Sequence, residues 1–450
     1  MKKTISILMV LVVTLAIFTG CSKKSEPAAT PAPEATKAEA VVKEPSLEEQ
    51  LKNANVTIQL WHAQTKANGV AMDMVIDQFN KTNPYNITVV GTCQGGYNDA
   101  HKKAVAALAA GNYPNINQAY NNNMMEYMPS GKLMDLTDYL TDDFGITAEE
   151  LATVFPSYLE ENHAFPDGKT YATSLGKSTE VMFYNKTFCD EHGIKVPTTL
   201  EELSESARQA SEIIGKPAFA LDSADNWGIY GPENFGAEYA DVQGNIYLFD
   251  ENNIDKTRAF YEWWEEGVDN GWFRTAGEDR YCSGPFSTGD IIFYVGSSSG
   301  TNYIMPDGFE CAVAPNPVGV NPKVIQQGAN FNGFVTGDPI VDLATSIVLE
   351  YLYTAEAGAL YAANTGYIPS NKAALELPVY TEMMAKGDIQ AEAKKVAVSY
   401  PDEWMAYDPV FKNSYKTRKA LSNPINGIAL TDASIDELIA DAQAELAKLK

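Results

Sequence analysis

The stretch "VTIQLWHAQTKANGVAMDMVIDQFNKTNPYNITVVGT", residues 56–92, contains two predicted strands with one predicted helix between them. Its first seven residues alternate apolar and polar side chains, which is typical of a half-buried β-strand. The middle of the stretch places Val70, Met74 and Phe79 at helical intervals and stops at Pro84, so it is predicted to be a helix. The final "NITVVGT" is the second predicted strand.

The same alternation continues along the chain. A helix is predicted in "YNDAHKKAVAALAAGNYPNI" and a short strand in "INQAY", and further strands and helices follow. Strands that alternate with helices of this length favour parallel βαβ units, so the predicted fold class is α/β. Sheets of this kind bind ligands at the carboxyl ends of their strands. The folded part, about 400 residues, exceeds one ordinary core, and two domains or lobes are expected.

The N-terminus has the features of a bacterial lipoprotein signal. Residues 1–20 combine two lysines with an apolar run that is shorter than the about 20 residues of a membrane-spanning helix. Small residues in "FTGC" come directly before Cys21, so we expect cleavage before Cys21 and lipid on its thiol. An ordinary signal peptide with a chance cysteine is the alternative. Residues 21–54 are rich in Ala, Pro and Glu and are predicted to be a disordered tether. A lipidated end and a tether predict an extracytoplasmic protein held at a bacterial membrane, in the periplasm or at the cell surface.

The chain is strongly acidic. Its formal net charge is −26, and without residues 1–20, which hold two lysines and no acid, 31 basic and 59 acidic residues leave −28. This charge argues against nucleic acid and anionic membrane surfaces as partners. Beyond Cys21 no CxxC pair occurs, and both free thiols and one or two disulfides fit the remaining cysteines. These are Cys93, Cys189, Cys282 and Cys311.

Common catalytic motifs are missing from the sequence. It contains no GxSxG, HExxH, GxxxxGK[ST] or GxGxxG segment. The four histidines lie too far apart in sequence to share a helix face, which argues against acyl transfer and zinc chemistry. A glycosidase needs only two carboxylates, and 59 acidic residues leave that class open. The prediction is a protein that is not an enzyme and uses no metal or cofactor, with a secreted carbohydrate-active enzyme as the alternative.

A set of aromatic and small polar residues lies at predicted strand ends and in loops. Flat aromatic rings stack on the C–H faces of sugars, and hydroxyl and amide groups satisfy sugar hydroxyls, so this mixture predicts a ligand pocket. In "NTGYIPSNKAA", residues 364–374, we expect the glycine and proline to hold a tyrosine ring at the mouth of a cleft, and core packing is the alternative. The candidate ligand-binding residues are Trp61, Tyr97, Asn121, Ser178, Trp227, Ser297, Gly328 and Tyr367.

Six segments in the same order carry a resemblance to a known family. They are "LWHA…VIDQFNKTNP", "GGYNDAHKKAVAALAAGNYPNINQAY", "KSTEVMFYNKTF", "WGIYGPENF", "GDIIFYVGSSSG" and "NTGYIPSNKAA". In them the chain resembles the extracellular solute-binding proteins of ABC importers, of the class that serves sugars and glycerol-3-phosphate. The resemblance covers residues 56–374 and is weaker over 240–280 and after 375.

The resemblance implies a two-lobed periplasmic-binding-protein (Venus flytrap, type II) fold with a hinge between the lobes. Hinge segments are expected near Thr173 and Pro315. By analogy the first lobe comprises residues 55–172 and 325–356, and the second lobe comprises residues 173–324 and 357–450.

The resemblance also implies roles for individual residues. Asn121 stands where an acidic residue is expected, and Lys416 and Arg418 are out of register with the arginine that would hold a phosphate. Poor complementarity between a phosphate dianion and an acidic chain favours a neutral mono- or oligosaccharide over glycerol-3-phosphate or a glycerophosphodiester. The residues that match ligand contacts of the family's glycerol-3-phosphate-binding members are Tyr97, Ser178, Ser297, Gly328 and Tyr367.

The implied function is capture of a small solute between two lobes and its delivery to the permease subunits of an ABC importer. The protein is expected to act as a monomer and to contact no nucleic acid. A surface lipoprotein that serves as an adhesin or sensor component is a third alternative.

Overall fold

The computed structural model describes residues 45–141 and 146–449, which form an α/β protein with two β-sheets. The predicted signal peptide, Cys21 and residues 21–44 of the predicted tether lie outside the described residues. Among the helices of the described part, none is both long enough and apolar enough to cross a membrane.

The folded part begins earlier than the predicted end of the tether at residue 54. Helix α1 (Leu47–Asn53) starts with a capping box, in which Ser46 and Glu49 satisfy each other's backbone N–H groups. Leu51 on this helix is fully buried, and α1 packs against α12 (Pro339–Tyr351). The prediction of a disordered tether over residues 21–54 is therefore wrong for residues 47–53. That prediction rested on amino-acid composition, which does not reveal a capping box.

The first sheet has five strands in the order β2–β1–β3–β11–β4. Strand β1 runs parallel to β2 and β3, which confirms the βαβ unit predicted at residues 56–92. Strand β11 pairs antiparallel with β3 and β4 and returns from much later in the chain. The strands are β1 (Val56–His62), β2 (Ile87–Cys93), β3 (Ile116–Ala119), β4 (Ala172–Thr173) and β11 (Asn330–Gly333).

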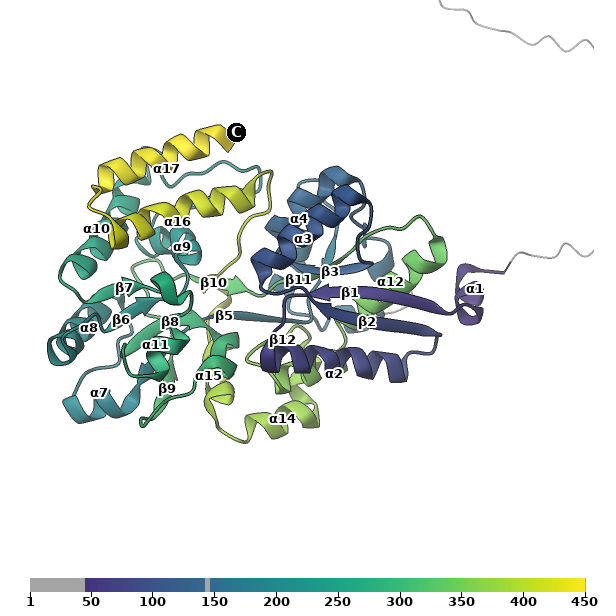
Figure 1. Ribbon diagram of the computed structural model, residues 1–450, viewed down its shortest axis with the longest axis horizontal. Helices are drawn as coiled ribbons and strands as arrows, with labels where there is room; N and C mark the ends of the chain where they lie inside the picture. Colours follow the sequence, from purple (N-terminus) through teal and green to yellow (C-terminus); the bar gives the residue numbers. More distant parts are fainter. Residues whose placement is uncertain (1–44, 142–145, 450) are drawn as a thin grey trace, which may run out of the picture. The chain divides into compact units, whose positions relative to one another are not determined.

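Helices pack on this sheet, and Figure 1 shows α3 on one side of it and α2 on the other. Helix α2 buries Met72, Val75 and Phe79, whereas Val70 is 61% and Met74 38% exposed. The helix is present as predicted, but its buried stripe contains Ala71 and Met72 and leaves out Val70 and Met74. The helices up to β4, with α12 and α13 from later in the chain, are α2 (Lys66–Thr82), α3 (Tyr97–Ala110), α4 (Asn121–Tyr127), α5 (Ala148–Leu151), α6 (Pro156–His163), α12 and α13 (Ala355–Ala363).

The second sheet is built around β5, which pairs with β8, β9, β10 and β12. Nine of its ten residues are buried, as expected of a central strand. Six of its strands follow one another in the order β13–β10–β5–β8–β6–β7. The other two, β9 and β12, each pair with β5 as well. The strands are β5 (Gly176–Asn185), β6 (Phe219–Leu221), β7 (Phe273–Thr275), β8 (Phe293–Ser297), β9 (Cys311–Ala314), β10 (Val324–Gln327), β12 (Ile368–Pro369) and β13 (Met405–Ala406).

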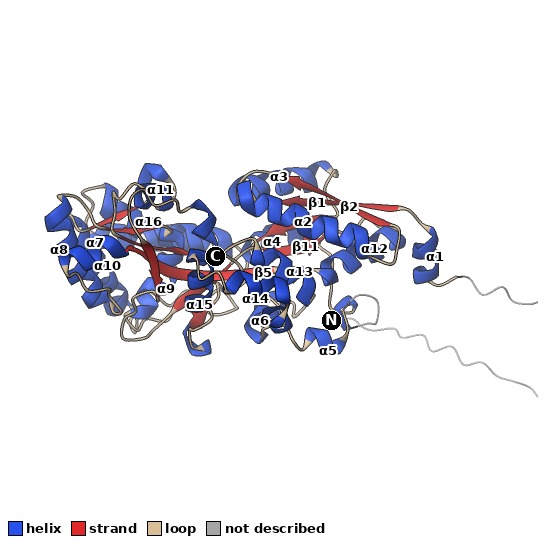
Figure 2. Ribbon diagram, turned by 90° about the horizontal axis from the view of Figure 1, so that it is seen from below, coloured by secondary structure: helices blue, strands red, loops and turns tan. Residues whose placement is uncertain are grey.

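An aromatic core lies under the helices that accompany the second sheet. Trp227, Phe260, Trp264 and Phe273 are at most 2% exposed and belong to one cluster. Figure 2 shows strands in red enclosed by blue helices. The remaining helices are α7 (Lys186–His192), α8 (Leu200–Ile214), α9 (Ala224–Asn234), α10 (Ile254–Asp269), α11 (Ser283–Ser287), α14 (Pro378–Met384), α15 (Ile389–Ala397), α16 (Ser414–Leu430) and α17 (Ile435–Leu449). The 3-10 helices are η1 (Met128–Ser130), η2 (Tyr139–Thr141), η3 (Gly277–Asp279), η4 (Ser298–Tyr303), η5 (Lys372–Glu376) and η6 (Asp402–Trp404).

The chain passes between the two sheets at three places: from β4 to β5, from β10 to β11, and from α13 to β12. The first place lies beside Thr173, near which a hinge is predicted, and its action as a hinge stays a prediction. Pro315 follows β9 and precedes β10, both of which belong to the second sheet, so the structure puts the second crossing at Gly328 instead.

Two elements lie on the other side of the predicted lobe boundaries. Strand β10 pairs with β5 and β13, although residues 325–356 are predicted to belong to the first lobe. Helix α13 packs on α2, although residues 357–450 are predicted to belong to the second lobe. Strand pairing decides the position of β10, and helix packing decides the position of α13. Both interactions join segments that are distant in the chain, and such interactions produce no periodic pattern in the sequence.

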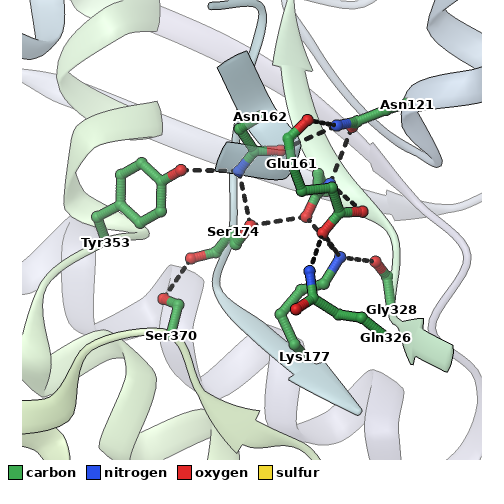
Figure 3. A network of polar contacts seen from close by, with 10 residues as sticks. Asn121, Glu161, Asn162, Ser174, Lys177, Gln326, Gly328, Tyr353 and Ser370 are labelled. Carbon is green, nitrogen blue, oxygen red and sulfur yellow. Dashed lines mark hydrogen bonds and ion pairs between the residues drawn. The ribbon is translucent and has the colours of Figure 1, made fainter. Parts of the chain in front are cut away.

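A buried polar network joins the first two crossings (Figure 3). Lys177 at the start of β5 is 0% exposed, and its Nζ lies 2.6 Å from Glu161 Oε2 on α6. The same Nζ donates to the backbone oxygen of Gly328 at 2.7 Å and to Asn330 Oδ1 at 3.3 Å. Gln326 Nε2 donates to Glu161 Oε2 at 2.5 Å. One ammonium group thus connects α6, β5 and the second crossing.

Further amides and hydroxyls extend the network. Ser174 Oγ donates to Asn330 Oδ1 at 2.7 Å, and Asn162 Nδ2 donates to Ser174 Oγ at 2.8 Å and Tyr353 OH at 2.7 Å. Ser370 Oγ donates to the backbone oxygen of Ser174 at 2.5 Å. Burial lowers the pKa of Lys177, and the Glu161 carboxylate offsets part of that effect. The ion pair is tolerated in the interior because the Lys177 ammonium group has three acceptors, on Glu161, Gly328 and Asn330.

Replacing Lys177 with methionine is predicted to lower the free energy of unfolding by about 3–5 kcal/mol, because Glu161 then remains buried without a cation. Urea denaturation measures the change. Lys186→Met is the matched control, since Lys186 pairs with Asp190 at 2.7 Å on the surface, and its stability should stay close to that of the wild type. Equal stability of the two variants would contradict this account of the network.

Candidate ligand-binding site

Two tyrosines from distant parts of the chain meet at the carboxyl edge of the first sheet. Tyr97 begins α3 directly after β2, and Tyr367 lies between α13 and β12. Their hydroxyl oxygens are 2.8 Å apart, and Gln64 Nε2 donates to Tyr97 OH at 3.0 Å. The ring of Tyr120 lies 5.1 Å from that of Tyr97, and the ring of Tyr361 lies 5.2 Å from that of Tyr367. Burial raises the pKa of both hydrogen-bonded tyrosines, so their hydroxyls stay protonated and can donate.

Three serine hydroxyls, two on strands of the second sheet and one on η4, adjoin this pair. Ser297 at the end of β8 donates through Oγ to Ser178 Oγ on β5 at 3.0 Å, and its Oγ lies 2.8 Å from Ser299 Oγ. Hydrogen bonding with Tyr97, Ser299 and Gln64 offsets part of the rise in the pKa of Tyr367. The serines and tyrosines therefore form one connected set of hydroxyl groups, here named the tyrosine–serine cluster (Tyr97, Tyr367, Ser178, Ser297 and Ser299).

Gly328 completes this cluster at the second crossing. It is buried and adopts φ +106°, a backbone conformation that favours glycine. A Cβ at this position would lie 3.3 Å from Lys177 Cα and 3.4 Å from Tyr367 Cε1. Five of the eight predicted ligand-binding residues, Tyr97, Ser178, Ser297, Gly328 and Tyr367, are thus brought together.

The other three predicted residues are not members of the tyrosine–serine cluster. Trp227 is 1% exposed, and its ring stacks on Trp263 with centroids 5.9 Å apart, so it packs in the aromatic core. Asn121 is buried in the polar network, where it donates to the backbone oxygen of Glu161 at 2.8 Å and accepts from Asn330 at 2.9 Å. Trp61 is half-buried at the end of β1, at the carboxyl edge of the first sheet.

A partly buried pair of charged side chains was not among the predicted site residues. Arg418 on α16 lies 3.2 Å from Asp408 and also donates to Asn226 Oδ1. Asp408 accepts from Asn122 Nδ2 at 3.1 Å, which connects α4 to the segment after β13. The sequence marks Arg418 only as a cation out of register with the family pattern, and no spacing rule links it to Asp408 and Asn226.

Glu180 lies two residues beyond Ser178 on β5 and is fully buried. Asn226 Nδ2 donates to its Oε1 at 2.6 Å, Gln327 Nε2 donates to the same oxygen at 3.1 Å, and Tyr230 OH also donates to the carboxylate. Burial raises the pKa of Glu180 to about 7, although the Asn226 and Tyr230 donors oppose the rise. Near neutral pH this carboxyl group is therefore only partly charged.

The described part of the chain holds no disulfide bond and no cluster of metal-ligand residues. In residues 45–141 and 146–449 no group of three or more His, Cys, Asp or Glu side chains is placed to hold a metal ion. All four cysteines in these ranges are free thiols, which decides between the two alternatives left open by the sequence.

The sequence matches the profile of the bacterial extracellular solute-binding proteins over residues 74–393. The chain belongs to this family. Membership confirms the predicted class and the interpretation as a binding protein instead of an enzyme, and the family is extracellular by its description.

Individual relatives agree with this assignment. The chain is 26% identical over 348 residues to the sn-glycerol-3-phosphate-binding periplasmic protein UgpB of Escherichia coli K12, covering 72% of this chain and 76% of the relative. UgpB of Mycobacterium tuberculosis, solved with glycerophosphocholine, superposes with a TM-score of 0.75 at 20% identity over 87% of this chain and 98% of that one. GacH of Streptomyces glaucescens, solved unliganded and with acarbose, gives 0.72 at 17% identity over 88% and 98%. These structures confirm the two-lobed α/β fold.

Replacing Glu180 with glutamine is predicted to change how stability depends on pH. The pKa of Glu180 is raised from 4.5 to about 7 on folding. Its stabilising contribution is therefore complete below pH 4.5 and is lost as the pH rises to about 7, a change of about 3 kcal/mol. Urea denaturation across this range should show the wild type losing that much more stability than Glu180→Gln. Parallel pH profiles would contradict the assignment.

Proposed function

We propose that the chain is the lipid-anchored solute-binding component of an ABC importer, and that it captures a neutral carbohydrate or related polyol between its two halves. The observation that carries the proposal is the meeting of Tyr97 and Tyr367 beside the serine hydroxyls. Groups from both sheets then contact one solute. A solute that touches both halves favours the closed form by the difference between its affinities for the two forms.

The chemistry of this region suits an uncharged polyhydroxyl ligand. Protonated tyrosine hydroxyls and serine hydroxyls both donate and accept, and they match sugar hydroxyls. The charge of Arg418 is balanced by Asp408, so the region offers little net charge to attract an anion. Structural relatives are described in complex with acarbose, maltose and mannobiose.

A glycerophosphodiester or glycerol-3-phosphate is the second candidate ligand, and Arg418 is the observation that favours it. The contacts with Asp408 and Asn226 occupy two of its nitrogen atoms, and a guanidinium has five N–H donors. The remaining donors suit a phosphate oxygen. UgpB relatives carry the names of such ligands.

Delivery to a membrane permease follows from the same proposal. The importer's own ATPase supplies the energy, since this sequence has no phosphate-binding loop. The protein acts as a monomer at the membrane surface, where a lipid on Cys21 retains it.

A thermal-shift screen with maltose, mannobiose, glycerol-3-phosphate and glycerophosphocholine tests the ligand class. A solute present at 100 times its dissociation constant adds about 2.7 kcal/mol of stability and raises the melting temperature. A shift with a sugar alone supports the first candidate, and a shift with a phosphate ester alone replaces it with the second.

Replacing Tyr367 with phenylalanine is predicted to weaken solute binding about tenfold or less, because one hydroxyl that bonds the solute and Tyr97 is lost. Titration calorimetry with the solute found in the screen measures the affinity. Tyr113→Phe is the matched control, since Tyr113 OH donates to the backbone oxygen of Val335 at 3.1 Å outside the tyrosine–serine cluster. Equal affinities of the two variants would remove Tyr367 from the site.

Replacing Cys21 with alanine is predicted to move the full-length protein from the membrane fraction to the soluble extracytoplasmic fraction. The thiol is the attachment point of the proposed lipid, and a single residue removes it without touching the folded part. Immunoblots of separated fractions measure the distribution. Retention of Cys21→Ala in the membrane fraction would contradict lipid anchoring at this residue.

A further inference from the structure

The loop that carries Tyr367, residues 364–367, lies in direct backbone contact with η4. A Cβ on Gly366 would lie 2.2 Å from the backbone oxygen of Ser298 and 2.7 Å from Ser299 Cα. Contacts this short leave no room for a side chain, and the opposing atoms are backbone and cannot rotate away. The close approach therefore requires glycine at position 366.

The loop is also held by a buried lysine. Lys394 on α15 is 0% exposed, and its Nζ donates to the backbone oxygen of Thr365. Burial lowers the pKa of Lys394 to about 7, with Asp388 acting in the other direction. Thr365 in turn donates through Oγ1 to the backbone oxygen of Tyr361 at 2.8 Å. Burying the amine of Lys394 lowers the stability of the fold. Its contact with the Thr365 carbonyl is therefore not explained by a gain in stability.

Asn302 of η4 links the loop to neighbouring elements. Its Nδ2 donates to Asn68 Oδ1 on α2 at 2.8 Å and to the backbone oxygen of Asn364 at 3.3 Å. Gln390 on α15 donates to Asn302 Oδ1. Elements from both halves of the protein therefore converge on residues 364–367.

We propose that Gly366 and Lys394 are positioning residues for solute binding, which fix loop 364–367 against η4. The hydroxyl of Tyr367 and the hydroxyls of Ser297 and Ser299 then form one surface before the solute arrives. This inference rests on the proposed function. Preorganisation of this kind removes the entropic cost of ordering the loop at the moment of binding.

Gly366→Ala tests the steric part, with Gly300→Ala as the matched control on the same 3-10 helix, where a Cβ would meet no atom within 4 Å. Hydrogen exchange of residues 298–303 and 364–368, measured by mass spectrometry on unliganded protein, should accelerate in Gly366→Ala only. Affinity for maltose, mannobiose or glycerophosphocholine, whichever the wild type binds, should fall at least tenfold in the same variant. Unchanged exchange, or faster exchange with wild-type affinity, would overturn the proposal.

The variant Lys394→Met distinguishes a role of Lys394 in positioning loop 364–367 from a role in the stability of the fold. Removing a buried amine should leave the melting temperature equal or higher, while affinity for the same probe falls several-fold and exchange at 364–368 accelerates. A lysine with a merely structural role would lower stability and leave affinity unchanged, and that result would overturn its positioning role. If the wild type binds none of the three probes, the ligand class proposed above fails, and the exchange comparison still decides whether Gly366 and Lys394 fix the loop.

Discussion

The ammonium group of Lys177 is enclosed by protein on all sides, and much of the architecture follows from what it requires. A buried cation needs a carboxylate and further acceptors, and Glu161, the Gly328 carbonyl and Asn330 supply them. These partners come from α6 and from the segment that connects the two sheets. Satisfying one charge therefore brings together the first two of the three crossings of the chain and fixes the path of the backbone at Gly328.

The tyrosine–serine cluster is a direct neighbour of this network. Gly328 packs against the ring of Tyr367, and Ser178 follows Lys177 on β5. Side chains alternate along a strand, so β5 directs Lys177 into the polar network while Ser178 and Glu180 face the other way, toward Ser297 and Asn226. One of the clustered hydroxyls, that of Ser178, is thus carried by β5, of whose ten residues nine are buried, next to the place where hinge motion occurs in two-lobed binding proteins.

The sequence predicted the α/β fold well, because the alternation in residues 56–92 is a local signal that the parallel pairing of β1 and β2 confirms. The same periodicity did not identify the buried face of α2 correctly, since Val70 and Met74 are exposed while Met72 is buried. The lobe boundary was misplaced at β10, a strand of four residues whose membership is decided by pairing with β5.

Resemblance to a family, more than periodicity, led to the five residues that the fold brings together. Trp227 was included for its chemistry alone, and its ring is packed against Trp263 in the core. Lys177 and Glu161 carried no signal, because a buried ion pair between a strand and a distant helix has no fixed spacing in sequence. The same holds for Arg418 and Asp408, whose partners Asn226 and Asn122 lie far away along the chain.

The central claim is that one solute is held by the tyrosine–serine cluster between the two halves of the protein. A crystal structure of the complex with the solute that raises the melting temperature most tests this claim most directly. Electron density for the solute is expected within hydrogen-bond distance of Tyr97 and Tyr367 on one side and of Ser178 or Ser297 on the other. Solute density at another place, such as the surface depression lined by Val105, Tyr113 and Lys132, with the tyrosine–serine cluster unchanged, would contradict the assignment of this cluster as the binding site.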